Sequence, residues 1–239
     1  MISFGCVRDL LGGRQVPLAQ CNTIWHSAKC RIVNKSGSIC GSYIIGVLRR
    51  YPYSSNPPNE KTWSKEEQMA YWINAYNAFT IKLITKYYPI KSIKDIGSSI
   101  QIPFVNTPWD IKFITIGKEK MDLNNIEHGK LRKLFDDPRI HMALVCASKS
   151  CPIFLNEAYD PKKLDEQLNT QSKAFLADPY RNKISSDKPQ LSMIFKWYSM
   201  DFDKNGSSVR DFVNRYSSIK IKPDAKISHI DYDWGLNEQ

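Results

Sequence analysis

The sequence predicts an α+β fold: a single domain with a small, mostly antiparallel sheet packed against several helices, one of them long and central. Three observations favour this class. Residues 64–88 carry an unbroken helical stripe of apolar side chains, and short β-rich segments follow at 109–116 and 183–194. Helical and strand patterns come mixed, without the strict alternation of a parallel α/β sheet. A chain of 239 residues is long enough to bury such a core.

The long helix has clear start and stop signals. Ser64 and Glu67 fit a capping box, in which each side chain pairs with the other residue's backbone N–H. Pro89 ends the helix, because the residue before a proline avoids helical geometry. Between these signals, apolar residues recur at helical spacing: Met69, Trp72, Ile73, Tyr76, Phe79, Leu83, Ile84 and Tyr87.

Two asparagines interrupt this stripe. Asn74 and Asn77 are three residues apart and therefore share one side of the helix. Asn77 also follows Ile73 by four residues, so its amide lies beside the buried stripe, where lacking a partner would cost about 1–3 kcal/mol. The favoured interpretation is a structural amide that holds a loop, and the alternative is a contact with a substrate.

The middle of the chain predicts a turn, a hairpin, a second helix and a core strand. Residues 92–96 suggest one helical turn, and 109–116 form a strand that turns at 117–120. Asp122 or Asn124 would cap a helix that reaches Phe135. After a tight turn at 137–138, residues 140–146 read as an interior strand, because their apolar run leaves no polar face for water.

The C-terminal third predicts short elements. Asp160 and Pro161 start a helix, residues 183–184 and 190–194 pair through a turn at 186–189, and Ser207 or Ser208 opens a last short helix. The aromatic stretch 229–234 is expected to pack onto the body. Residues 1–60 are poorly readable, with only turn and linker signals and one short apolar run, so residues 61–239 are taken as the domain.

Composition excludes several function classes. A hydrophobic content of 42% with 24% charged residues is ordinary for a soluble globular protein, and no apolar run approaches the roughly 18 residues of a membrane span. The net charge of +10 is scattered, without the focused patch that nucleic-acid binding favours. It indicates a basic, soluble surface or attraction to an anionic cell-wall or membrane surface. The chain as given has no signal peptide, and its compartment is left open.

Six cysteines fall into two groups. Four lie in the first forty residues and are interpreted as free thiols, while Cys146 and Cys151 lie in the central stretch. None forms a CxxC pair, so neither a zinc ribbon nor a thioredoxin motif is indicated.

Four motifs in order resemble one known family. They read YWINAYNAF at 71–79, IEHGKLR at 126–132, RIHMALVCASKSCP at 139–152 and DYDWGLN at 231–237. Together they resemble the domain of unknown function 547 family over roughly residues 60–239. The resemblance implies a single α+β domain, found in exported bacterial proteins and in larger eukaryotic ones, and it allows export if the start is truncated. It implies no reaction.

Two positions depart from the pattern that the resemblance implies. Similar members place a glycine directly after the first cysteine, where this chain has Ala147. If that position needs a left-handed turn, Ala147 strains the loop. Some eukaryotic relatives carry serine in place of Cys151, which favours Cys146 for any catalytic role.

Cys146 is the best candidate nucleophile. It ends the predicted strand and precedes the small residues Ala147 and Ser148, whose free N–H groups could form an oxyanion hole. The alternative is a buried cysteine that only fills space. His141 is a poor partner, because five strand steps separate the two residues by about 16 Å and point them to opposite faces. It is interpreted as a core or edge histidine.

His128, on the preceding helix, is therefore the predicted base. Glu127 cannot orient it directly, because neighbours on a helix point about 100° apart. Asn77 or Asn74 could orient it instead, as an amide does in cysteine proteases.

These residues lead to the hypothesis of a papain-like thiol hydrolase or transferase acting on an amide or peptide bond, without a cofactor or metal. Its substrate is unknown, with peptide or cell-wall material the expected class. The catalytic candidates are Cys146, His128, Asn77 and Glu127, and the substrate-binding candidates are Asn74, Tyr76, Ser148, Ser150 and Cys151.

Two alternatives stay open. One is a non-catalytic binding module with a structural polar cluster. The other is a zinc site made of Cys146, Cys151, His128 and His141, although its Cys-x4-Cys spacing is loose.

Overall fold

The structure is a computed structural model that describes residues 61–97, 99–102 and 105–237. The expectations for residues 1–60, including the four N-terminal cysteines, lie outside these residues. The described part confirms the α+β class. Its helices are α2 (Lys65–Tyr87), α3 (Arg132–Leu134), α4 (Ile140–Ala143), α5 (Leu164–Ala177), α6 (Ile194–Trp197), α7 (Ser199–Phe202) and α8 (Val209–Tyr216). Its strands form an antiparallel pair, β1 (Ile114–Ile116) with β2 (Glu119–Met121), and a parallel pair, β3 (Gln190–Ser192) with β4 (Ser228–Ile230).

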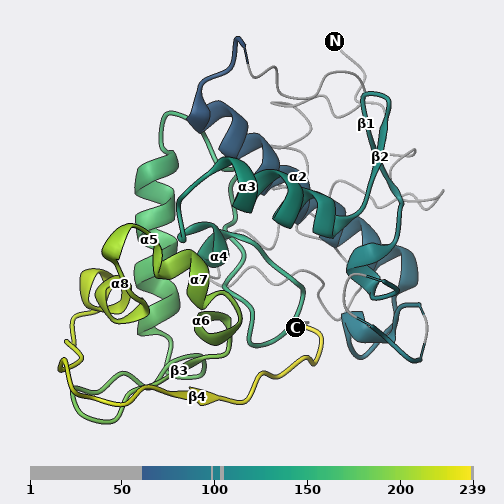
Figure 1. The fold of residues 1–239 in the computed structure, drawn as a ribbon. Helices are drawn as coiled ribbons and strands as arrows, with labels where there is room; N and C mark the ends of the chain where they lie inside the picture. Colours follow the sequence, from purple (N-terminus) through teal and green to yellow (C-terminus); the bar gives the residue numbers. More distant parts are fainter. Residues whose placement is uncertain (1–60, 98, 103–104, 238–239) are drawn as a thin grey trace, which may run out of the picture.

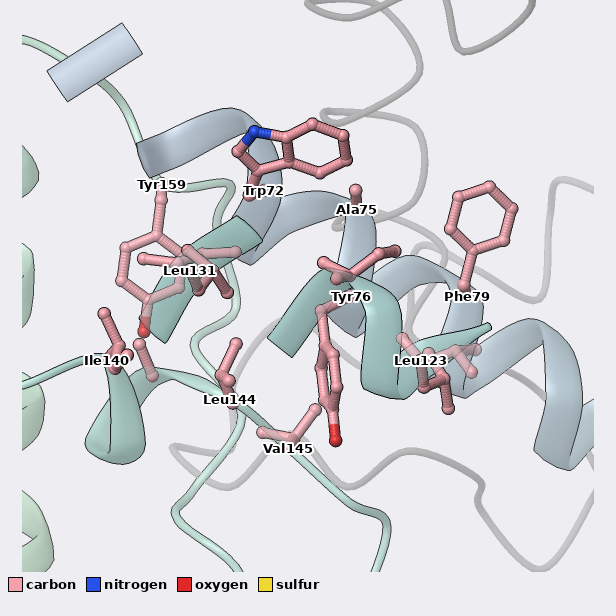
Figure 2. Close-up of a cluster of buried hydrophobic side chains, with 14 of the residues drawn as sticks. Trp72, Ala75, Tyr76, Phe79, Leu123, Leu131, Ile140, Leu144, Val145 and Tyr159 are labelled. Atoms are coloured by element: carbon pink, nitrogen blue, oxygen red, sulfur yellow. The ribbon is translucent and has the colours of Figure 1, made fainter. Parts of the chain in front are cut away.

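Helix α2 crosses the middle of the molecule, as predicted (Figure 1). Both halves of the capping box are present: the Ser64 N–H donates to Glu67 Oε2 at 2.8 Å, and the Glu67 N–H donates to Ser64 Oγ at 3.2 Å. Tyr88 is already extended before Pro89. Fifteen of the 23 helical residues are buried, so α2 contributes many of the side chains of the larger core. Figure 2 shows Tyr76 pointing from α2 toward the segment that carries Leu144 and Val145.

The predicted hairpin forms, but it is shorter than expected. β1 and β2 pair in register from Ile114 with Met121 to Ile116 with Glu119, around a turn in which Gly117 has a φ of 61°. The start of the predicted strand is instead a 3-10 turn at Pro108–Asp110. Asp110 Oδ2 accepts the Thr107 N–H at 2.9 Å and so closes this turn. Local side-chain capping therefore outweighs the β propensity of the following residues.

The second helix begins where expected and then departs from α geometry. The Asn125 N–H donates to Asp122 Oδ1 at 2.6 Å, so Asp122 caps the helix. Residues Asn125–Leu131 form a π-helical segment, in which the Arg132 N–H bonds the Glu127 carbonyl, and α3 follows. Wider π turns of this kind are found frequently at functional sites.

The predicted interior strand at 140–146 is wrong. Its first half is the short helix α4, which Asp137 and Pro138 start: Asp137 Oδ1 accepts the Arg139 N–H at 3.0 Å, and the Asp137 carbonyl accepts the Ile140 N–H. An Asp-Pro pair is a helix start as well as a turn, and a short apolar run does not distinguish helix from strand.

The second half of that run is extended but lies in no sheet. Asn77 takes the place of a neighbouring strand: its Nδ2 donates to the Ala143 carbonyl, and its Oδ1 accepts the Val145 N–H, both at 3.0 Å. This confirms the structural interpretation of Asn77. A side-chain amide thus lets buried backbone run past α2 without unpaired polar groups.

The C-terminal third forms a second core around α6, α7 and α8. Helix α8 begins after Ser208, whose Oγ accepts the Asp211 N–H, as expected. Lys183 and Gln190 make the predicted antiparallel bridge, but the longer pairing of β3 is with β4, which the sequence did not indicate. Beyond β4, residues 231–237 return along the edge of the molecule toward its middle (Figure 1). This stretch, called the closing segment below, packs onto the body as predicted.

Candidate functional site

A cavity of about 430 Å³ lies where α2, the π-helical segment, α6 and the closing segment meet. Most of its wall is aromatic or apolar, with a few polar groups between. Its lining residues are Tyr76, Trp109, Asn124, Glu127, His128, Arg132, His141, Leu144, Cys146, Cys151, Pro152, Ile194, Trp197, Tyr198, Tyr232 and Trp234. A largely apolar cavity with a few convergent polar groups is the usual form of a ligand site.

The loop from Cys146 to Cys151 forms part of this wall and is held by the closing segment. The Lys149 N–H donates to the Gly235 carbonyl and the Asn237 N–H to the Ala147 carbonyl, both at 2.8 Å. Ala147 has a φ of 64°, so the loop does need a left-handed residue there. Left-handed geometry costs a non-glycine residue about 1–2 kcal/mol, which the contacts with the closing segment offset.

Cys146 is partly exposed as a residue, and two hydroxyl groups lie beside its sulfur. Ser148 Oγ and the Tyr232 hydroxyl each lie 3.2 Å from it, and Ser148 Oγ lies 3.0 Å from the Tyr232 oxygen, so the single Ser148 hydrogen serves either the sulfur or Tyr232. A hydrogen bond from the Cys151 thiol lowers the pKa of Cys146 most, and these two donors add to it against the effect of burial, so the pKa is about 6. At neutral pH Cys146 is therefore mostly thiolate.

The Cys151 thiol is the buried partner of this sulfur. Its Sγ lies 2.8 Å from the Cys146 backbone nitrogen, whose N–H points at it, and 3.7 Å from the Leu144 carbonyl oxygen. Burial raises the pKa of Cys151 well above its ordinary value. The two cysteines thus differ in charge state at neutral pH although they are neighbours.

His128 lines the same cavity as Cys146, and its Nδ1 is engaged by Arg132. Its Nδ1 lies 2.7 Å from Arg132 Nη1, and an arginine can only donate, so Nδ1 accepts and Nε2 keeps the hydrogen of a neutral ring. Burial and the Arg132 charge lower the pKa of His128 despite the nearby Glu127. Within the described residues, the hydrogen-bond partners of the Cys146 sulfur are not histidines.

His141 lies on the same cavity as Cys146, contrary to the strand spacing, because residues 140–143 are helical. It is buried, stacks on Tyr198 at 4.0 Å between ring centroids, and places Nε2 2.8 Å from Asp201 Oδ2. Arg132 Nε also donates to Asp201 Oδ2 at 2.5 Å. Although burial raises the pKa of Asp201, its hydrogen bonds with His141 and Arg132 bring it well below the usual range.

Glu127 is buried on the cavity wall and accepts the Tyr198 hydroxyl, while burial and this contact keep the pKa of Tyr198 high. Of the substrate-binding candidates, Tyr76 and Cys151 line the cavity. Ser148 and Ser150 are buried beside it and hold the loop, Ser150 through its Oγ, which accepts the Asp233 N–H at 2.9 Å.

The two asparagines of α2 do not line the cavity. Asn74 donates to the Tyr159 carbonyl and accepts the Tyr159 N–H, both at 2.9 Å, in the same way that Asn77 holds residues 143–145. Both amides fix backbone segments, so neither has the geometry of the histidine orienter that the sequence suggested.

Three residues that line the cavity, and Asp201 behind it, were not predicted from the sequence. Asp201 is 60 positions from His141, and no local pattern links them. Arg132, Tyr232 and Trp234 stand inside the quoted motifs, but no rule of spacing assigned them to the cavity. The aromatic run in the closing segment was the one usable signal, because aromatic side chains gather at ligand sites.

Within the described residues, no group of three or more histidine, cysteine, aspartate or glutamate side chains is arranged to hold a metal ion. The four residues of the zinc alternative all line the cavity, but they do not form such a group. Among the helices of this part, none is long and apolar enough to cross a membrane.

Comparison with known families gives one match, to the family described as "Protein of unknown function, DUF547", over residues 60–176. Curated proteins and solved structures give no match. The matched stretch includes α2, the π-helical segment and both cysteines, while Asp201, Tyr232 and Trp234 follow it. Residues 60–176, just under half of the chain, are therefore similar to the DUF547 family.

Proposed function

We propose that the protein is a thiol-dependent hydrolase or transferase that acts on an amide or peptide bond, with Cys146 as its nucleophile. One observation carries the proposal: Cys146 lines a cavity, with two hydroxyl groups 3.2 Å from its sulfur that help to lower the pKa of its thiol. The thiolate is the reactive form of cysteine, and here it forms without a histidine in contact.

The hydroxyl chain from Ser148 through Tyr232 to Cys146 has a second role in this scheme. Burial raises the pKa of Tyr232 well above its ordinary value, so its hydroxyl keeps its proton and remains a donor. When the sulfur attacks a carbonyl carbon, the negative charge moves from sulfur to the carbonyl oxygen. The Tyr232 hydroxyl lies 3.2 Å from the sulfur, so in this scheme it moves its hydrogen bond from the sulfur to the carbonyl oxygen.

In this scheme Tyr232 adds a donor to the oxyanion hole expected from the N–H groups of Ala147 and Ser148, and the other N–H groups of the loop do not contribute. The N–H groups of Cys146, Lys149, Ser150 and Cys151 already donate within the protein. They are therefore not available to a substrate oxygen without rearrangement of the loop.

His141 replaces His128 as the acid–base group of the scheme. Asp201 holds Nε2 of His141, which leaves Nδ1 to exchange a proton, the arrangement by which a carboxylate or amide orients the imidazole of a thiol hydrolase. His141 enters this step as the imidazolium, with its Nε2–H bonded to Asp201, and gives its Nδ1 proton to the departing amine as the carbon–nitrogen bond breaks and the thioester forms. It then takes a proton from the water or amine that attacks the thioester, and Cys146 leaves as thiolate.

The test is to trap the thioester. The full-length protein is mixed with an activated ester such as p-nitrophenyl acetate and with a panel of peptide amides, quenched in acid and digested with trypsin. Cleavage after Arg139 and Lys149 isolates Cys146 in residues 140–149. We expect acylation of that peptide in the wild type and in His128→Ala, its loss in Cys146→Ser, and slow turnover in His141→Gln. Absence of acylation by every ester and amide would refute the proposal.

A non-catalytic binding module is the second candidate, and the aromatic wall favours it. Trp197 stacks on Trp234 at 5.7 Å and Tyr232 lies 4.7 Å from Trp234, which makes a continuous surface for flat or apolar ligand groups. In that case ligand would quench tryptophan fluorescence equally in the wild type and Cys146→Ser, without acylation or release of product.

A further inference from the structure

We propose that Cys146 and Cys151 form a redox site, in which a peroxide oxidises Cys146 and the Cys151 thiol closes an intramolecular disulfide. The proposal goes beyond acyl transfer and does not need it. It starts from the placement of the Cys151 sulfur 2.8 Å from the Cys146 backbone nitrogen, inside the same loop and against the same cavity.

The two thiols have the unequal characters that such chemistry requires. Cys146 is partly exposed and ionised at neutral pH, so it is the one that a small oxidant reaches. Cys151 is 2% exposed and keeps its proton, so it is shielded from direct oxidation. A low-pKa cysteine poised beside a second, resolving cysteine is the arrangement of redox-sensing sites.

The loop backbone keeps the pair together. Arg181 donates from Nε to the Cys151 carbonyl at 2.6 Å and from Nη2 to the Lys149 carbonyl at 3.0 Å. The Cys151 N–H also bonds the Ser148 carbonyl at 3.2 Å. These contacts hold the backbone of residues 148–151, and the Cys146 N–H contact with the Cys151 sulfur keeps that sulfur against residue 146.

The chemistry balances with a peroxide as the oxidant. The Cys146 thiolate attacks one oxygen of hydrogen peroxide, the O–O bond breaks, and Cys146 sulfenic acid forms with release of hydroxide. The Cys151 sulfur then attacks the Cys146 sulfur, its proton joins the departing hydroxyl group as water, and the S–S bond forms. A dithiol reductant reverses the bond by thiol–disulfide exchange.

Under the proposed function, this disulfide would reversibly inactivate Cys146 as a nucleophile and protect its sulfur from further oxidation. That consequence rests on the proposed function, whereas the disulfide itself does not. The loss of Cys146 to irreversible sulfinic acid is the competing outcome that a resolving cysteine prevents.

The test uses the full-length protein, hydrogen peroxide and peptide mapping. After oxidation, free thiols are blocked in acid with N-ethylmaleimide, and trypsin cuts between the cysteines after Lys149. We expect residues 140–149 to be linked to residues 150–162 in the wild type, and dithiothreitol to separate them. In Cys151→Ser, whose hydroxyl still donates to the thiolate, we expect dimedone to trap a sulfenic acid on Cys146 and sulfinic acid to accumulate several-fold faster.

Three results would overturn the inference: Cys146 that resists peroxide, sulfinic acid that forms equally fast in the wild type and Cys151→Ser, or links that join Cys146 to the N-terminal cysteines instead. Thermal melts of both proteins check that the variant folds. A linked pair without acylation would contradict only the proposed function, and acylation without a linked pair would contradict only the redox inference.

Discussion

Replacing Tyr232 by phenylalanine removes one hydrogen-bond donor from the Cys146 sulfur while keeping the ring that packs on Trp234. A hydrogen bond to a charged group contributes about 1.5–3 kcal/mol, and one pKa unit corresponds to about 1.4 kcal/mol. The full loss would thus raise the pKa of Cys146 by about 1–2 units. Ser148, which lies 3.2 Å from the sulfur and loses its acceptor on Tyr232, can turn its hydroxyl to the thiolate instead. We therefore expect the pKa of Cys146 to rise by the smaller amount, from about 6 to about 7.

The assay is the rate of iodoacetamide alkylation of residues 140–149 as a function of pH, read by mass spectrometry. Tyr180→Phe is the matched control, because its hydroxyl also bonds the closing segment, at Asp233 Oδ2 and 2.8 Å, but does not touch the sulfur. An unchanged inflection in Tyr232→Phe, or an equal shift in Tyr180→Phe, would refute the argument that the hydroxyl chain stabilises the thiolate.

Three further predictions concern stability, measured by urea unfolding. Asn77→Ala leaves a buried N–H of Val145 and the carbonyl of the Ala143 backbone unpaired, so we expect a loss of about 2–4 kcal/mol, and a loss under 1 kcal/mol would contradict it. At position 147, whose φ is positive, we expect Ala147→Gly to change stability by less than about 1 kcal/mol and Ala147→Val to cost about 2 kcal/mol or more, so equal effects would count against the left-handed turn. Because folding lowers the pKa of Cys146 from 9.0 to about 6, its thiolate stabilises the fold fully above pH 9 and loses this effect as the pH falls to 6. The wild type should therefore lose stability relative to Cys146→Ser across that window, and parallel pH profiles would refute the shift.

Local signals in the sequence were sufficient for much of the fold. The capping box and Pro89 bound α2 correctly, and Ser208 marks the start of α8, because caps and prolines act on the nearest backbone groups. The family's glycine at position 147 raised the condition of a left-handed residue there, and Ala147 does have a positive φ.

The errors arose where a distant residue decides the local structure. Residues 140–146 carry an apolar run without a period, and Asn77, 66 positions before Ala143, supplies the partners that a sheet would have given. The π register between 125 and 131 has no residue signature of its own. The parallel pairing of β3 with β4 likewise joins segments 38 positions apart.

The site was predictable only where local sequence signals identify its residues. Cys146, Cys151, Tyr76, Glu127 and His128 were all chosen from the sequence and line one cavity, while their roles stay predictions. Pairings within the site could not be predicted, because His141 bonds Asp201 and Cys146 meets Tyr232 only through the folding of the C-terminal third.

The most direct test of the account is the pH dependence of Cys146 alkylation in the wild type, with Cys151 as the internal control. We expect the alkylation rate of residues 140–149 to rise with an inflection near pH 6, which His128→Ala leaves unchanged, while residues 150–162 react slowly throughout. An inflection near the ordinary thiol value of about 8.5, or equal labelling of the two cysteines, would contradict a thiolate at Cys146 and with it the proposed nucleophile.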